Sequence, residues 1–82
     1  MPSNFDLMRE KRERLKVKRN RLRIEAKAIA RDIPVLINPS LTDIEKMDVA
    51  GAASKMDELV MKQAELLGIQ SQLWDLEDEL GN

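Results

Sequence analysis

The stretch Pro34-Val35-Leu36-Ile37-Asn38-Pro39-Ser40-Leu41 divides the chain into two long segments and decides its fold. Both prolines lack the N–H that a helix interior needs, and each disfavours helical geometry at the preceding residue. By contrast, residues 3–33 contain neither glycine nor proline. We therefore expect one helix over about 4–32, an ordered connection over 33–42 whose apolar side chains tuck under the helix ends, and a second helix beyond it.

Local signals at the ends of both segments set the expected helix limits. Ser3 with Asp6, and likewise Thr42 with Glu45, have the spacing of a capping box, in which side chains bond the free N–H groups of a helix start. Near the other end of the chain, Gly81 is a typical helix stop. The second helix is therefore predicted over about 43–80, and a break near Gly51, within a run of small residues, is the alternative.

The composition agrees with packed helices and narrows the chemistry. At 82 residues and 9.4 kDa the chain has room for one small domain, and aromatic residues make up only 2% of it. The absence of cysteine and histidine excludes disulfides, thiolate or imidazole metal ligands, and nucleophiles activated by a histidine base. We therefore expect a single all-α domain that is not an enzyme and has no cofactor or metal site.

Apolar residues recur at heptad spacing in both segments, which favours coiled-coil-like packing. The stripe of the first segment consists of Met8, Leu15, Leu22 and Ile29. The second segment has two neighbouring stripes. One consists of Val49, Ala53, Met56, Val60, Leu67 and Trp74. The other consists of Leu59, Leu66, Ile69, Leu73, Leu76 and Leu80. These patterns predict an antiparallel helical hairpin, and the wide apolar face of its second helix indicates more than one neighbour.

The alignment predicted for the hairpin follows from the two expected helix limits. Folding back between residues 32 and 43 sets Leu15 beside Val60, so that the stripe of Val60 faces the first helix. Using the leucine stripe in its place would bring Arg12 near Lys62, where like charges repel. The valine-containing stripe is therefore predicted to close the hairpin.

Charge divides the chain into opposite halves. Residues 1–33 carry eleven Lys or Arg and five Asp or Glu, whereas residues 34–82 carry three Lys and ten Asp or Glu. An antiparallel hairpin would lay the basic arm against the acidic arm, so that the two charges offset each other. The charge pattern thus favours the same hairpin.

The leucine stripe, which this alignment leaves uncovered, predicts self-association. A lone hairpin of this size buries little apolar surface, and an unpaired leucine face is typical of an interaction site. We expect a homo-oligomer, preferably a two-fold dimer that forms a four-helix bundle, with a different protein as the other candidate partner. The predicted function is that of a non-enzymatic interaction or assembly module. The residues expected at the contact are Leu66, Ile69, Leu73, Trp74, Leu76 and Leu80.

The basic segment supports an alternative function, binding to the phosphate backbone of nucleic acid. Closely spaced lysines and arginines neutralise phosphates and release counterions. Acidic residues interrupt the run, and Phe5 and Trp74 are the only aromatic side chains that could stack on bases. Such binding would follow the backbone and not the base sequence. The candidate contacts are Arg9, Arg12, Arg14, Lys16, Arg19, Arg21 and Arg23.

The ends of the chain and its hydropathy bear on location. No apolar stretch reaches the roughly 20 residues of a membrane span. The basic N-terminal segment leads into further charges and not into the apolar core of a signal peptide. We therefore expect a cytoplasmic protein without membrane contact, and the missing cysteines agree with that compartment.

Overall fold

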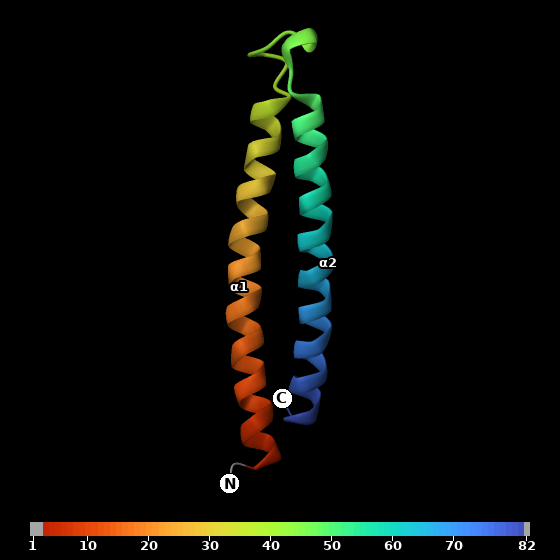
Figure 1. Cartoon of the computed structure of the whole chain (residues 1–82). Coiled ribbons are helices and arrows are strands. Elements are labelled where there is room, and N and C mark those ends of the chain that lie inside the picture. The colour runs from red at the N-terminus through yellow and green to blue at the C-terminus, as the bar shows by residue number, and fades with distance from the viewer. Residues whose placement is uncertain (1–2, 82) are drawn as a thin grey trace.

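Two long helices lie side by side in the computed structural model, which describes residues 3–81 (Figure 1). Helix α1 covers Asn4–Leu36, helix α2 covers Val49–Glu79, and a single 3-10 turn, η1, covers Ile44–Lys46 in the connection. The helices run antiparallel along a rod of 63 × 18 × 15 Å, with the connection at one end and both chain ends near the other (Figure 1). The predicted all-α hairpin is confirmed.

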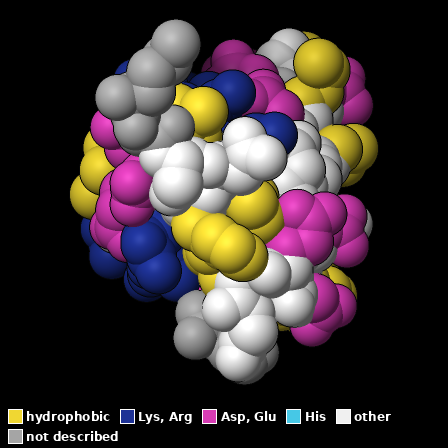
Figure 2. Space-filling model, turned by 90° about the horizontal axis from the view of Figure 1, so that it is seen from below, with side chains coloured by type: hydrophobic (Ala, Val, Ile, Leu, Met, Phe, Trp, Pro, Cys, Tyr) yellow, Lys and Arg dark blue, Asp and Glu magenta, His cyan; other side chains and the backbone are white. Residues whose placement is uncertain are grey.

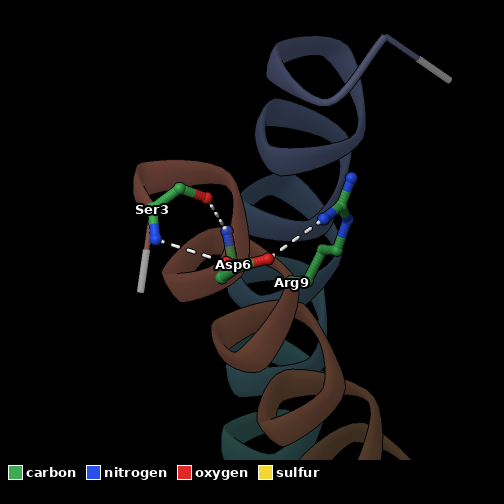
Figure 3. A network of polar contacts seen from close by, with 3 residues as sticks. All are labelled: Ser3, Asp6 and Arg9. Carbon is green, nitrogen blue, oxygen red and sulfur yellow. Dashed lines mark hydrogen bonds and ion pairs between the residues drawn. The ribbon is translucent and has the colours of Figure 1, made fainter. Parts of the chain in front are cut away.

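The start of α1 has the predicted capping box. Ser3 Oγ accepts a hydrogen bond from the N–H of Asp6, and the Asp6 carboxylate accepts one from the N–H of Ser3, both at 3.2 Å. Arg9 Nη1 also donates to Asp6 Oδ1 at 3.2 Å (Figure 3). The hydrogen bonds from Ser3, and then the positive charge of Arg9, lower the pKa of the Asp6 carboxyl. The cap therefore keeps a negative charge at the positive end of the helix dipole.

The end of α1 differs from the prediction, because the helix continues through Pro34 to Leu36. Proline within the last turn removes only one backbone hydrogen bond. The side chains of Ile33 and Leu36 are half-buried at the end of the hairpin. We infer that their packing holds this turn helical despite the proline.

The start of α2 also differs, since the predicted capping box of Thr42 and Glu45 does not form. Asp43 precedes the short η1 turn and makes no side-chain cap bond. The true cap is Asp48, whose carboxylate accepts a 2.9 Å hydrogen bond from the N–H of Gly51. A Cβ at position 51 would collide with this carboxylate, so glycine leaves room for the cap. Gly51 therefore lies in the first turn of α2, and the helix is continuous beyond it.

The stop of α2 agrees with its prediction, whereas the connection does not. Gly81 has a φ of +79°, the left-handed conformation that glycine adopts without a steric penalty, and α2 ends just before it. Of the apolar side chains in the predicted connection, Ile33 and Leu36 are half-buried, whereas Val35, Ile37 and Leu41 are not tucked under the helix ends. Val35, Leu41 and Ile44 are 70 to 77% exposed, so the tip of the hairpin carries exposed apolar side chains.

The face of α2 that contacts α1 is the leucine stripe and not the valine-containing one. Leu22 of α1 forms a core cluster with Ile69 and Leu73 of α2, and Leu15 and Leu66 pack against it. The prediction that the leucine stripe lacks a partner within the hairpin is therefore wrong. Its members are all buried or half-buried, namely Leu59, Leu66, Ile69, Leu73, Leu76 and Leu80.

Two ion pairs across the helices show the alignment. Lys62 Nζ donates a 2.7 Å hydrogen bond to Glu25 Oε2, and Lys55 Nζ lies 3.6 Å from Asp32 Oδ2. Both lysines and both acids are seven residues apart, so the two pairs belong to one antiparallel register. The predicted alignment would have set Lys62 beside residue 13. The observed register is shifted by about 12 residues, which corresponds to about 18 Å of helix.

The shift has its cause in the helix limits. Because α1 ends at residue 36 and α2 begins at residue 49, the chain folds back later than predicted. At this register Lys62 meets Glu25 and not Arg12, so the repulsion that argued against the leucine stripe does not arise.

Candidate interaction surface

A strip of exposed apolar side chains runs along α2 next to the buried leucine stripe. It covers about 37 Å of helix from residue 49 to residue 74. We call it the α2 strip, and it consists of Val49, Ala53, Met56, Val60, Leu67 and Trp74. Its five large members are 47 to 64% exposed, and Ala53 is exposed as well. An apolar surface of this length is typical of a contact site.

The α2 strip lies on one flank of the hairpin. Val60, Leu67 and Trp74 each follow a residue of the leucine stripe by one position, which is a rotation of about 100° around the helix. Lys55 and Lys62 continue the heptad position of Ile69 and Leu76, on the edge of the leucine stripe farther from the α2 strip, where they meet the acids of α1. One flank of the hairpin is therefore ionic and the other is apolar along α2.

Sequence reasoning placed this strip inside the hairpin, so it missed the surface. Trp74 is the one residue predicted at a contact between copies that is largely exposed, at 61%. The signal that could have found the correct face is the matching seven-residue spacing of Glu25 with Asp32 and of Lys55 with Lys62. Only the leucine stripe places these lysines toward α1.

Some basic side chains of α1 lie on the same flank of the hairpin as the α2 strip. Arg9, Lys16 and Arg23 are spaced by seven residues. Arg23 lies two positions before Glu25, which places the two side chains about 160° apart around the helix. Arg23 therefore points away from the ionic flank. These three cations therefore share the flank of the α2 strip.

The charges of the two helices are not neutralised by each other. Within residues 3–81 the only ion pairs between the helices join Glu25 and Asp32 of α1 to Lys62 and Lys55 of α2. These pairs use acids of the basic helix and both lysines of the acidic one, so within residues 3–81 none of the eleven cations of α1 and none of the seven acids of α2 pairs across the helices. The basic arm lies beside the acidic arm as predicted, but no ion pair joins a cation of α1 to an acid of α2 within the described residues. Figure 2 shows Lys and Arg mainly over α1 and more of the Asp and Glu over α2.

The pair of Glu25 and Lys62 is the strongest electrostatic contact between the helices. The hydrogen bond from Lys62 lowers the pKa of the Glu25 carboxyl. The same bond raises the pKa of the Lys62 ammonium, and the negative charges of Glu65 and Glu58 add to this effect. Both groups therefore stay charged over a wider pH range than they would alone.

The residues predicted to contact nucleic acid have different surroundings. Arg9, Lys16 and Arg21 form ion pairs with acids of α1 itself at 3.2, 3.6 and 3.9 Å. Arg14 and Arg23 are exposed and form no ion pair with any described residue. Other cations of α1 share this condition. The full set of exposed α1 cations without an ion pair in residues 3–81 is Lys11, Arg14, Lys18, Arg23, Lys27 and Arg31.

Arg12 and Arg19 differ from the other cations because they face α2. Both are half-buried, and their Nε atoms are buried with no hydrogen-bond acceptor among the described residues. The nearest acid to Arg12 is Glu13, whose Oε1 lies 3.5 Å from Arg12 Nε. These two arginines interrupt the apolar stripe of α1 and are poorly placed to reach a phosphate.

The described part of the chain offers no enclosed site for a small ligand. Residues 3–81 form no pocket, and they contain no cluster of acids that could hold a metal ion. Neither helix is long and apolar enough to cross a membrane. The candidate site is therefore a surface, made of the α2 strip and the cations of α1 beside it.

Comparison with known proteins adds no further information about this surface. No protein-family model matches the chain, and neither a curated protein nor a solved structure matches it.

Proposed function

We propose that this chain is a non-enzymatic helical interaction module that associates with itself through the α2 strip. The observation that carries the proposal is the line of five large apolar side chains, 47 to 64% exposed, along a single flank. Full burial of an exposed side chain of this kind contributes about 1.5–3 kcal/mol, so covering the exposed half of each contributes roughly half of that and favours association. The hairpin itself has few buried residues, so a partner would also stabilise the fold.

Sedimentation of purified chain tests this proposal. We expect the wild type to form a concentration-dependent oligomer, and Leu67→Glu to shift it to the monomer, because Leu67, between Val60 and Trp74, is the most exposed of the large side chains in the strip, at 64%. Ile24→Glu is the matched control, because Ile24 is 71% exposed on α1 and lies outside the strip. Circular dichroism of each variant checks that the helices remain.

Three outcomes can be told apart in that experiment. A dimer lost in Leu67→Glu and kept in Ile24→Glu supports the α2 strip as the contact. A dimer that survives Leu67→Glu moves the contact elsewhere. A wild type that stays monomeric at the highest concentration reached contradicts self-association, and the strip would then need a different protein as its partner.

A second candidate function is binding to the phosphate backbone of nucleic acid through α1. The observation that favours it is the set of six exposed cations without an ion pair in the described residues, which spans residues 11 to 31 or about 30 Å of helix. A gel-shift titration with random duplex at two salt concentrations tests it. A shift that is lost with added salt and weakened by Arg14→Gln supports this function, and no shift at low salt contradicts it.

A further inference from the structure

The charges that do not pair between the two helices of one copy limit how two copies can meet at the α2 strip. Net charge is only −1, so two copies do not repel each other as whole molecules. Locally, however, α1 is strongly basic and α2 strongly acidic, and the contact between them consumes charges of the minority sign on each helix. Each copy therefore offers one basic and one acidic helix to its neighbour.

Two symmetric arrangements would bring the two strips together. With a two-fold axis perpendicular to the helices and in the plane of the hairpin, the two α2 helices run antiparallel and each α1 lies over the α1 of the other copy. With a two-fold axis parallel to the helices, the two α2 helices run parallel and each α1 lies beside the α2 of the other copy. The first arrangement sets basic helix against basic helix, whereas the second sets basic against acidic.

We propose that a second copy of this chain covers the α2 strip about a two-fold axis parallel to the helices. Each α2 then lies over the groove between α1 and α2 of the other copy. This inference rests on the proposed self-association and specifies its geometry. Its basis is the complementarity between the cations of α1 and the acids of α2, which do not pair with each other across the helices of one copy.

The flank of α1 that borders the strip suits this arrangement. Arg9, Lys16 and Arg23 carry long aliphatic stems that can cover apolar side chains while their charged ends stay in water. Trp74 of the other copy would lie at the level of Arg9 and Lys16, since α2 runs antiparallel to both α1 helices. A cation over the face of an indole ring is a favourable contact. The strip thus meets aliphatic and aromatic surface together with opposite charge.

Variants with one introduced cysteine distinguish the two arrangements. No other disulfide can form in them, because the natural chain contains no cysteine. Gln70 is half-buried beside the strip and near one end of it. A parallel axis sets position 70 beside its own counterpart, so Gln70→Cys should form a disulfide-linked dimer in high yield under mild oxidation. An antiparallel pair with full overlap separates these positions by about 25 Å and sets position 70 beside position 53.

The controls make each outcome decisive. Ser54→Cys lies on the side of α2 away from the strip, so it should remain almost entirely monomeric under the same oxidation. Cross-linking of Gln70→Cys with itself supports the parallel arrangement. If Gln70→Cys cross-links only when mixed with Ala53→Cys, the parallel arrangement is overturned, whereas self-association stands. If sedimentation shows no dimer of the wild type, both the arrangement and the proposed function are overturned.

Discussion

Lys62 Nζ lies 2.7 Å from Glu25 Oε2, and this hydrogen bond joins two residues 37 positions apart in the chain. With the parallel contact of Lys55 and Asp32 it fixes which residues of the two helices are neighbours. A one-heptad slip would set each of these charges beside a different partner. The pair therefore acts on the choice of register more than on the total stability, as is usual for ion pairs that remain partly in water.

The pH dependence of this pair follows from its two pKa shifts. The pKa of Glu25 is lowered in the fold, so its contribution to stability is present above the pKa of the unfolded carboxyl, 4.5, and is lost as pH falls through the lower folded value. The pKa of Lys62 is raised, so its contribution is present below 10.5 and is lost as pH rises through the higher folded value. Between these limits the pair is intact.

Replacing Lys62 by Met should therefore destabilise the hairpin at neutral pH and matter less in acid. Urea unfolding of the wild type and of Lys62→Met at pH 7 and below pH 4 measures the difference in free energy of unfolding. That difference should shrink as Glu25 becomes protonated. The control is Asp75→Asn, an exposed acid of α2 without an ion pair in residues 3–81. An equal loss at both pH values would show that Lys62 acts through packing alone.

Truncating a residue of the leucine stripe should destabilise the hairpin much more than truncating a residue of the α2 strip. Leu73 is only 1% exposed, so Leu73→Ala should cost about 2–5 kcal/mol of stability. Leu67 is 64% exposed, so Leu67→Ala should change the stability of the monomer by less than about 0.5 kcal/mol. Thermal and urea unfolding at low protein concentration measures both. The reverse order of the two losses would contradict the observed face of the hairpin.

Removing the guanidinium of Arg19 should stabilise the hairpin. Its Nε is buried with no acceptor in the described residues, and an unpaired buried donor costs about 1–3 kcal/mol. Methionine keeps the unbranched stem and removes the donor. Arg19→Met should therefore raise the midpoint of urea unfolding, and Arg23→Met, at an exposed position, should leave it unchanged.

The two glycines inside α2 should respond differently to alanine. A Cβ at Gly68 would meet nothing within 4 Å, so Gly68→Ala should stabilise α2 by about 1 kcal/mol through helix propensity. A Cβ at Gly51 would displace the Asp48 carboxylate that caps the helix, and losing a cap costs about 1 kcal/mol. Gly51→Ala should thus gain little or nothing. The melting temperatures of the two variants give the comparison.

The sequence predicts the hairpin and its outer caps well, because those features depend on local signals. Ser3 and Asp6 lie next to each other in space whatever the rest of the chain does, and Gly81 ends α2 by its own backbone geometry. Pro34 and Thr42 mislead for the same reason. Their local preferences are worth only a few kcal/mol, and we infer that the partial burial of Ile33 and Leu36 and the cap at Asp48 outweigh them.

The contact face is harder to predict because it depends on the register. α2 carries two apolar stripes of similar length, and an error of a few residues at each helix end reverses the choice between them. Like-charge repulsion between Arg12 and Lys62 excludes the leucine stripe only at the predicted alignment. At the observed alignment Lys62 pairs with Glu25, so this repulsion does not arise. Small boundary errors thus become large errors about which surface is free.

The opposite charges of α1 and α2 run side by side along the rod, so the electric moment of the molecule points across its width and not along its length. The electric field of the hairpin therefore orients an approaching charged molecule toward one long edge of the rod before contact. Helix axes lie about 8–10 Å apart, which is close to the screening length of about 10 Å at 0.1 M salt. Orientation before contact will therefore be strong in dilute buffer and short-ranged at higher ionic strength. The rate of encounter, and not only its strength, will depend on the salt concentration.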